Sequence, residues 1–233
     1  MKMEKFKKAL IVGAGSGLSA SLARKFAAEG LEVAVAARNP DKLASLCRET
    51  GAISFAVDAA DPEEVAGLFD AVEATLGAPD VVVYNASYRV RGPFETLDPD
   101  KVARTLAVTA YGAFLVAQQA VRRMLPNNHG AVLLTGASAG VKGYKQSAPF
   151  AMGKFALRGM AQSMARELFP QGIHVAHFVI DGGIRSVTRT DDTQNPDSLL
   201  DPDAIAGSYW HVLNQPRSAW AWEIELRPWV ENF

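Results

Sequence analysis

The stretch ALIVGAGSGLSASLARKFAAEG, residues 9–30, determines the fold expected for this chain. Four apolar residues come first, glycines follow at positions 13, 15 and 17, and Leu18, Leu22 and Phe26 then recur at four-residue spacing. This order predicts a buried strand, a tight turn and a helix with one apolar face. Glycines let a backbone turn sharply and approach a ligand closely, and the helix start offers free N–H groups to a pyrophosphate. The stretch therefore indicates a dinucleotide site, although an ordinary strand–helix turn would also fit three glycines.

The composition is that of an ordinary globular protein. The 233 residues, 48% hydrophobic and 21% charged, predict a single domain over residues 1–233 with a substantial core. A net charge of −1 argues against nucleic acid as a partner. No apolar run is long enough for a signal peptide or a membrane span, and Cys47 has no cysteine to pair with, so we expect a cytoplasmic protein.

Apolar runs alternate with helical patterns along the whole chain. Such alternation predicts an α/β protein with a doubly wound, mostly parallel sheet that has helices on both faces. The expected strands are 9–12, 33–37, 53–57, 81–84, 131–135, 175–180 and, more weakly, 223–226. Long helices are expected over 99–125 and 147–169. Helix starts of the type Asx-Pro-acid follow Asn39, Asp61, Asp98 and Asp201. The polar, aperiodic stretch 184–200 predicts a substrate loop after a strand's carboxyl end.

Arg38 directly follows the expected strand 33–37, where a protein of this fold meets the adenosine ribose. An acid at this point would favour the free 2′-hydroxyl of NAD, but Ala36 and Ala37 precede the arginine. An arginine can bind the 2′-phosphate of NADP through a charge-assisted hydrogen bond. The position favours NADP(H) over NAD(H), with a solvated surface arginine as the alternative.

Several motifs together make the chain resemble the short-chain dehydrogenase/reductase family over nearly its whole length. They are the glycine turn 13–19, Asp58 in FAVDAAD, the YNAS segment 84–87, GAFLVAQ at 112–118 and GIHV at 172–175. Ser19 stands where the family pattern has its third glycine. The resemblance implies a Rossmann-type sheet of about seven strands, a small-molecule substrate and a homodimer or homotetramer.

The resemblance also implies which residues hold the cofactor. Asp58 matches the family acid that contacts adenine, and Asn85 and Ala86 form the centre of the family's Asn-Asn-Ala-Gly motif. The complete expected cofactor set is Gly13, Ser16, Gly17, Leu18, Arg38, Asp58, Ala59, Asn85, Ala86, Lys154 and Gly182.

The catalytic positions depart from the family pattern. The family has a Tyr-x-x-x-Lys pair one helical turn apart, in which the tyrosine gives a proton to the carbonyl and the lysine assists it. Here the segment is Phe150-Ala-Met-Gly-Lys154, and phenylalanine has no proton to give. Ser138 is the candidate for the family serine, with Ala137 as the alternative alignment. Thr109 stands for the family asparagine of the long helix, and Asp181-Gly182 for its Pro-Gly.

Two functions remain open at this point. The first is an NADP(H)-dependent oxidoreductase acting on a small carbonyl or related compound, with Tyr144, Ser147 or Tyr88 as replacement proton donor. The second is a non-catalytic NADP(H)-binding protein, favoured by Phe150 and Thr109. No metal is expected, because the four histidines show no ligand spacing and there is no cysteine set.

Overall fold

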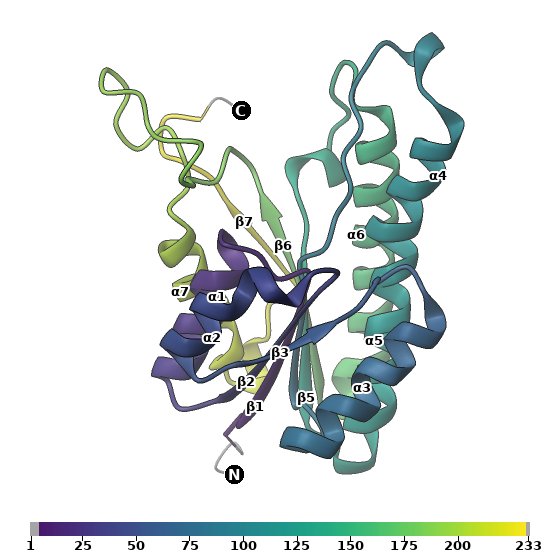
Figure 1. The fold of residues 1–233 in the computed structure, drawn as a ribbon, viewed down its shortest axis with the longest axis vertical. Coiled ribbons are helices and arrows are strands. Elements are labelled where there is room, and N and C mark those ends of the chain that lie inside the picture. Colours follow the sequence, from purple (N-terminus) through teal and green to yellow (C-terminus); the bar gives the residue numbers. More distant parts are fainter. Residues whose placement is uncertain (1–4, 232–233) are drawn as a thin grey trace.

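Seven parallel strands form one sheet in the order β3-β2-β1-β4-β5-β6-β7 (Figure 1). The chain order reverses direction between β1 and β4, which pair in parallel, with Ala9 opposite Val81 and Val12 opposite Tyr84. This computed structural model describes residues 5–231. The strands are β1 (Lys8–Val12), β2 (Glu32–Ala37), β3 (Ile53–Ala56), β4 (Val81–Tyr84), β5 (Gly130–Thr135), β6 (Ile173–Ile180) and β7 (Glu223–Leu226).

Helices cover both faces of the sheet, as Figure 1 shows. One face carries α1 (Leu18–Ala28), α2 (Ala44–Thr50) and α7 (Pro202–Leu213), and the other carries α3 (Pro62–Leu76), α4 (Pro99–Leu106), α5 (Gly112–Met124) and α6 (Ala148–Leu168). Successive strand residues point to opposite faces, so Ile11 packs with Phe26 on one side while Leu10 packs with Phe69 on the other. The expected single-domain α/β fold and its seven strands are confirmed.

The Asx-Pro-acid segments begin helices as expected, because the side chain of the first residue accepts hydrogen bonds from the first turn. Asp61 Oδ1 accepts from the N–H groups of Glu63 and Glu64 at 2.9 and 3.0 Å. Asp98 and Asp201 cap α4 and α7 in the same way. Asn39 caps a short 3-10 turn, Pro40–Leu43, which leads into α2.

The long helix expected over 99–125 contains a π-helical segment, Ala107–Tyr111, between α4 and α5. The hydroxyl of Tyr84, at the end of β4, donates to the carbonyl oxygen of Val108 inside this segment. A side-chain donor that binds a helical carbonyl competes with the regular backbone ladder, which accounts for the local widening. Gly112 is required beside it, because a Cβ there would lie 2.4 Å from the carbonyl oxygen of Ala59.

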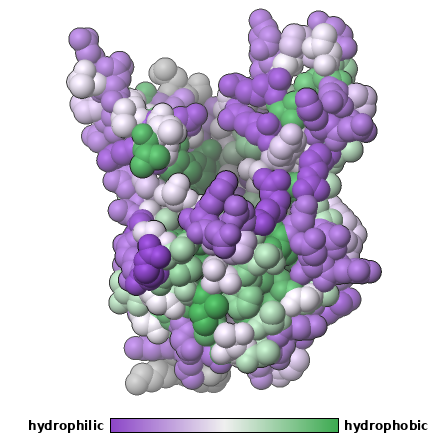
Figure 2. Space-filling view, in the orientation of Figure 1, coloured by the Kyte–Doolittle hydropathy of each residue, from purple (hydrophilic) through white to green (hydrophobic). Residues whose placement is uncertain are grey.

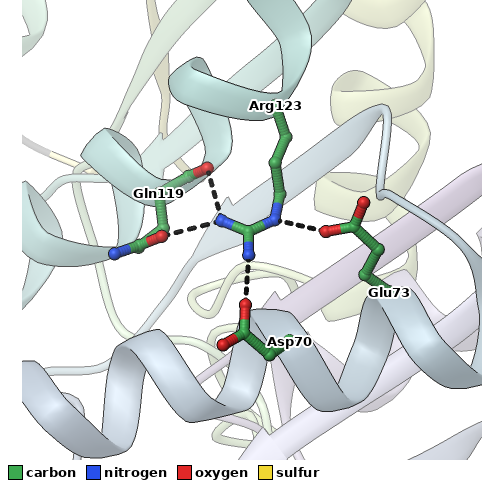
Figure 3. Close-up of polar contacts among 4 residues, drawn as sticks. All are labelled: Asp70, Glu73, Gln119 and Arg123. Atoms are coloured by element: carbon green, nitrogen blue, oxygen red, sulfur yellow. Dashed lines mark hydrogen bonds and ion pairs between the residues drawn. The ribbon is translucent and has the colours of Figure 1, made fainter.

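One guanidinium group joins α3 to α5 (Figure 3). Arg123 of α5 donates to Asp70 at 2.6 Å and to Glu73 at 2.8 Å, both on α3, and to the Gln119 side chain at 2.7 Å. The Arg123 side chain is 17% exposed, so it is shielded more than its acidic partners are. This contact holds two helices of the same layer together.

The segment 184–200 contains no helix and no strand, as expected from its sequence. Backbone bridges join Ile184 to Leu200 and Ser186 to Arg189, so the segment is a closed loop at the carboxyl end of β6. Within residues 5–231, no helix is both long enough and apolar enough to cross a membrane.

Candidate functional site

The glycine turn after β1 lies directly against the segment after β4. Gly13 has a φ of +87°, and a Cβ on it would be 2.3 Å from the backbone nitrogen of Ala86. The N–H groups of Gly13 and Ala14 both donate to the carbonyl oxygen of Ala36 at 2.9 Å. Glycine is therefore required at this position both for the backbone conformation and for the close approach.

Ser19 connects the same turn to Asn85. The Asn85 amide donates to Ser19 Oγ at 2.7 Å, and Ser19 Oγ donates to the carbonyl oxygen of Gly13 at 3.1 Å. Ser19 is buried, so these hydrogen bonds are protected from water. Where the family pattern has its third glycine, this chain has a serine that fixes the turn through a side chain. The sequence alone showed the substitution but not this link.

The start of α1 is open. Gly17 directly precedes this helix, no side chain caps the helix start, and the first turn of the helix carries no acid. The starts of α3, α4 and α7, in contrast, each have a capping aspartate and an acid in the first turn. A Cβ on Gly15 or Gly17 would meet nothing within 4 Å. Ser16 is exposed and Leu18 is buried under the turn. Free N–H groups with space in front of them are what an oxyanion requires.

The carboxyl ends of β2 and β3 bring Arg38 and Asp58 near each other. Arg38 is exposed, and Ala59 is buried beneath Asp58. Asp58 Oδ2 accepts from Arg104 of α4 at 2.5 Å, and Oδ1 accepts from the Ala60 N–H at 3.0 Å. Burial raises the pKa of the Asp58 carboxyl, but these bonds and the charges of Arg104 and Arg38 outweigh it, so the net pKa is lowered. The contact of Arg104 with Asp58 was not expected from the sequence, because nothing in the residues around Arg104 indicates that it reaches Asp58.

Lys154 belongs to α6, and its side chain lies in the interior with the amine at the carboxyl end of β5. Lys154 is only 3% exposed, and its Nζ donates to the carbonyl oxygen of Thr135 at 2.7 Å. Burial lowers the pKa of Lys154 to about 8. The ring of Phe150 lies one helical turn before it, with its centroid 5.7 Å from Nζ. The expected placement of these two side chains on one face of the helix is confirmed.

Thr109 lies in the π-helical segment and is completely buried. Its Oγ1 accepts from the Tyr88 N–H at 3.4 Å. A Cβ on Gly153 would be 3.0 Å from Thr109 Cβ, so the threonine packs closely on α6 one residue before Lys154. Three of the four expected catalytic positions, Thr109, Phe150 and Lys154, are thus brought together.

Ser138 begins a 3-10 turn, Ser138–Gly140, just beyond β5. Its Oγ accepts from the Tyr144 hydroxyl at 2.9 Å. Of the other two candidate proton donors, Ser147 is buried and accepts from Arg91 at 3.4 Å, and Tyr88 meets Thr109 through its backbone. Tyr144 is therefore the candidate whose hydroxyl is in contact with Ser138. Ala137, the alternative to Ser138, has no hydroxyl.

The end of β6 carries a buried acid. Asp181 is 3% exposed and pairs with Arg227 at 2.9 Å and with Lys142 at 3.6 Å. Lys142 Nζ in turn lies 5.7 Å from the centre of the Tyr144 ring. Gly182 follows with a φ of +145°, and a Cβ there would be 2.8 Å from Pro228. The chain thus turns sharply away from β6 at the expected cofactor residue.

These residues line one edge of the sheet, and Figure 2 shows a hollow between two lobes on this side of the molecule. In Figure 1 the loop 184–200 forms one lobe and the segment before α4 forms the other. Within residues 5–231 no group of three or more His, Cys, Asp or Glu side chains could hold a metal ion.

A glycine turn at the point where strand order reverses, followed by an open helix start, defines the dinucleotide-binding class of doubly wound α/β proteins. Residues 7–197 match the short chain dehydrogenase family, and the chain belongs to that family.

Individual relatives agree with this assignment. A short-chain dehydrogenase of known structure from Rhodopseudomonas palustris is 33% identical, with a TM-score of 0.85 over 97% of this chain and 100% of that chain. An uncharacterised oxidoreductase of Staphylococcus aureus is 28% identical over 226 residues, 94% of this chain and 96% of the relative. A metagenomic short-chain oxidoreductase solved in complex with NADP is 26% identical, with a TM-score of 0.83 over 95% of this chain and 97% of that chain.

Proposed function

We propose that this protein is an NADP(H)-dependent oxidoreductase that acts on a small carbonyl or related compound. The observation that carries the proposal is the uncapped start of α1, with Gly15 and Gly17 leaving open space in front of its N–H groups. Aspartates occupy the corresponding positions of α3, α4 and α7, so an anion from outside the chain is expected here. The NADP complex of the metagenomic relative supports this choice of ligand.

The residues of this edge fit a dinucleotide phosphate. Gly13, Ser16, Gly17 and Leu18 would hold the pyrophosphate, and Asp58 and Ala59 would border the adenine. Arg38 would bind the 2′-phosphate, since it is exposed and no carboxylate of residues 5–231 forms an ion pair with it. Asn85 and Ala86 follow β4 and Gly182 follows β6, on either side of β5, and all three would border the nicotinamide half.

When bound, the reduced nicotinamide supplies a hydride to the carbonyl carbon. Lys154 would hold a proton at Nζ beside the nicotinamide ribose, where its burial keeps water away. Phe150 would form an apolar wall at the position of the family tyrosine and cannot donate a proton. Ser138 would orient the carbonyl oxygen, and Tyr144, whose hydroxyl bonds to Ser138 Oγ, is the proton donor that we favour. Thr109 would set the spacing between the two long helices.

The exposed faces of the long helices support the expected dimer. Four large apolar side chains on this surface, Tyr111, Phe114, Met152 and Phe155, are each at least 43% exposed. Apolar side chains gathered on one surface commonly mark a protein interface. We therefore propose that α5 and α6 pack against their copies in a symmetric dimer.

The second candidate function is a non-catalytic NADP(H)-binding protein. Phe150 and the buried Thr109 favour it, because neither can supply the groups that the family uses for proton delivery. Losing a general acid typically lowers a rate by about 10²–10⁴-fold, which still permits reduction of a reactive carbonyl or imine. The two candidates therefore differ in whether any turnover is detectable, and not in cofactor binding.

A stopped-flow experiment distinguishes them. The NADPH complex is mixed with aldehydes, diketones and imines while absorbance at 340 nm is followed. Decay that is lost in Tyr144→Phe but kept in the matched variant Tyr111→Phe, whose ring lies on the outer helix surface, supports the oxidoreductase. Tight NADPH binding with no decay for any compound would support the non-catalytic protein instead.

A further inference from the structure

Two further arginines lie near Arg89, which contacts the ring of Phe150. The guanidinium carbon of Arg89 lies 4.8 Å from the Phe150 ring centroid, on a side chain that comes from the segment after β4. Arg91 follows it in the same segment, and Arg189 belongs to the loop 184–200. Two chain segments that are far apart in sequence thus bring positive charge close to Arg89, the residue that contacts the Phe150 ring.

Backbone and side-chain contacts hold these arginines at the edge of the sheet. Arg91 Nε donates to the buried Ser147 Oγ at 3.4 Å, and the Gly92 N–H donates to the Gln146 carbonyl oxygen at 3.1 Å. Arg189 sits in a tight turn in which it exchanges backbone hydrogen bonds of 2.8 and 3.1 Å with Ser186. Its guanidinium group lies over Gly183, where a Cβ would be 2.9 Å from Nη1.

Within residues 5–231, no carboxylate neutralises the positive charges of Arg89, Arg91 and Arg189 through an ion pair. Burial lowers the pKa of Arg89, and the positive charges of Arg91 and Arg189 lower it further, so both arginines lie close enough to Arg89 to repel it. Among residues 5–231, no carboxylate lies within ion-pair distance of any of them, whereas Arg104 and Arg158 each pair with one carboxylate and Arg123 pairs with two. The buried acid of this edge, Asp181, is already held by Arg227 and Lys142.

We propose that the substrate carries an oxyanion, a carboxylate or a phosphate, that binds to Arg89, Arg91 and Arg189 while its carbonyl faces Ser138. Arginine suits this task because its planar donors bind both groups through charge-assisted hydrogen bonds. The face of Phe150 attracts the Arg89 guanidinium, so the ring that replaces the family tyrosine also positions an anion-binding group. This proposal rests on the proposed function, since it names the substrate class of the same site.

A binding experiment tests the arginines without requiring turnover. Benzoate and phenyl phosphate are titrated calorimetrically into the NADPH complex, with uncharged methyl benzoate as the comparison. We expect one of the two anions to bind at least tenfold more tightly than the ester. Arg89→Gln and Arg189→Gln should each weaken that anion about tenfold or more, as expected for a charge-assisted contact. Arg122→Gln, an exposed arginine of α5, is the matched control and should change nothing.

Each result has a definite meaning. Whichever anion binds more tightly identifies the oxyanion as carboxylate or phosphate. Equal binding of the ester and both anions, or unchanged anion binding in Arg89→Gln and Arg189→Gln, overturns the proposal. Failure of the wild-type protein to bind NADPH in a separate titration counts against the proposed function, and the anion titrations are then run on the free protein. A matched activity assay compares 4-carboxybenzaldehyde and 4-formylphenyl phosphate with methyl 4-formylbenzoate.

Discussion

Replacing Lys154 by Met should make the folded protein more stable at neutral pH and less able to bind NADPH. Lys154 is almost fully buried, and burial lowers its pKa from the ordinary 10.5 to about 8. At pH 7 the amine is protonated in both the folded and the unfolded chain, so folding carries the whole cost of burying the charge. A shift of this size corresponds to about 3 kcal/mol of unfolding free energy.

The sign of the pH dependence follows from the two pKa values. Between pH 8 and 10.5 the unfolded chain binds the proton and the folded chain does not, so the wild-type stability rises with pH in this interval. Methionine removes the charge but also the hydrogen bond to Thr135, which is worth about 1 kcal/mol. We expect Lys154→Met to be about 2 kcal/mol more stable than wild type at pH 7, and most of this advantage to be gone by about pH 10.

Urea unfolding at pH 7 and pH 10 measures this difference. Lys145→Met, at an exposed position in the loop before α6, is the control and should show no pH-dependent change relative to wild type. His177, whose pKa burial lowers to about 4, is neutral at both pH values and does not contribute. A difference between Lys154→Met and wild type that is the same at both pH values would refute the account of a desolvated lysine.

Three further results are expected. Arg123→Ala should lower the unfolding free energy by about 1 kcal/mol, because it removes contacts between α3 and α5, whereas Arg122→Ala, which is exposed, should change it by less than about 0.5 kcal/mol in the same urea titration. Phe150→Tyr should raise the single-turnover rate of carbonyl reduction about 100-fold if the site lacks only the family's acid, and no gain in a stable, NADPH-binding variant would argue against that site. Light scattering at micromolar concentration should report a dimer or tetramer, and a monomer would reject the assembly through α5 and α6.

The fold could be predicted because its signals are local. Most strands are short apolar runs, and α3, α4 and α7 each start at an Asp-Pro-acid segment whose capping depends on residues two or three positions apart. The π-helical segment could not be predicted, because it depends on the Tyr84 hydroxyl reaching Val108 from another element. Periodicity in the helix itself is almost unchanged by one wider turn.

The site was predictable only in part, because some of its contacts are local in the sequence and others join different elements. The relation between Phe150 and Lys154 is one helical turn, and the sequence spacing is sufficient to predict it. The contacts of Arg104 with Asp58, of Tyr144 with Ser138 and of Arg89 with Phe150 join different elements. Such contacts depend on how helices and loops are placed over the sheet, which no local pattern encodes.

The most direct test of the central claim is a calorimetric titration of NADPH and NADH into wild type and Arg38→Ala. Arg38 is exposed directly after β2, and the two residues before it are alanines, Ala36 and Ala37, where an acid would favour NAD. A charge-assisted contact is worth about 1.5–3 kcal/mol, so the variant should lose at least about tenfold in NADPH affinity while NADH affinity changes little. Tighter wild-type binding of NADH than of NADPH, or an equal loss for both cofactors in the variant, would contradict the account.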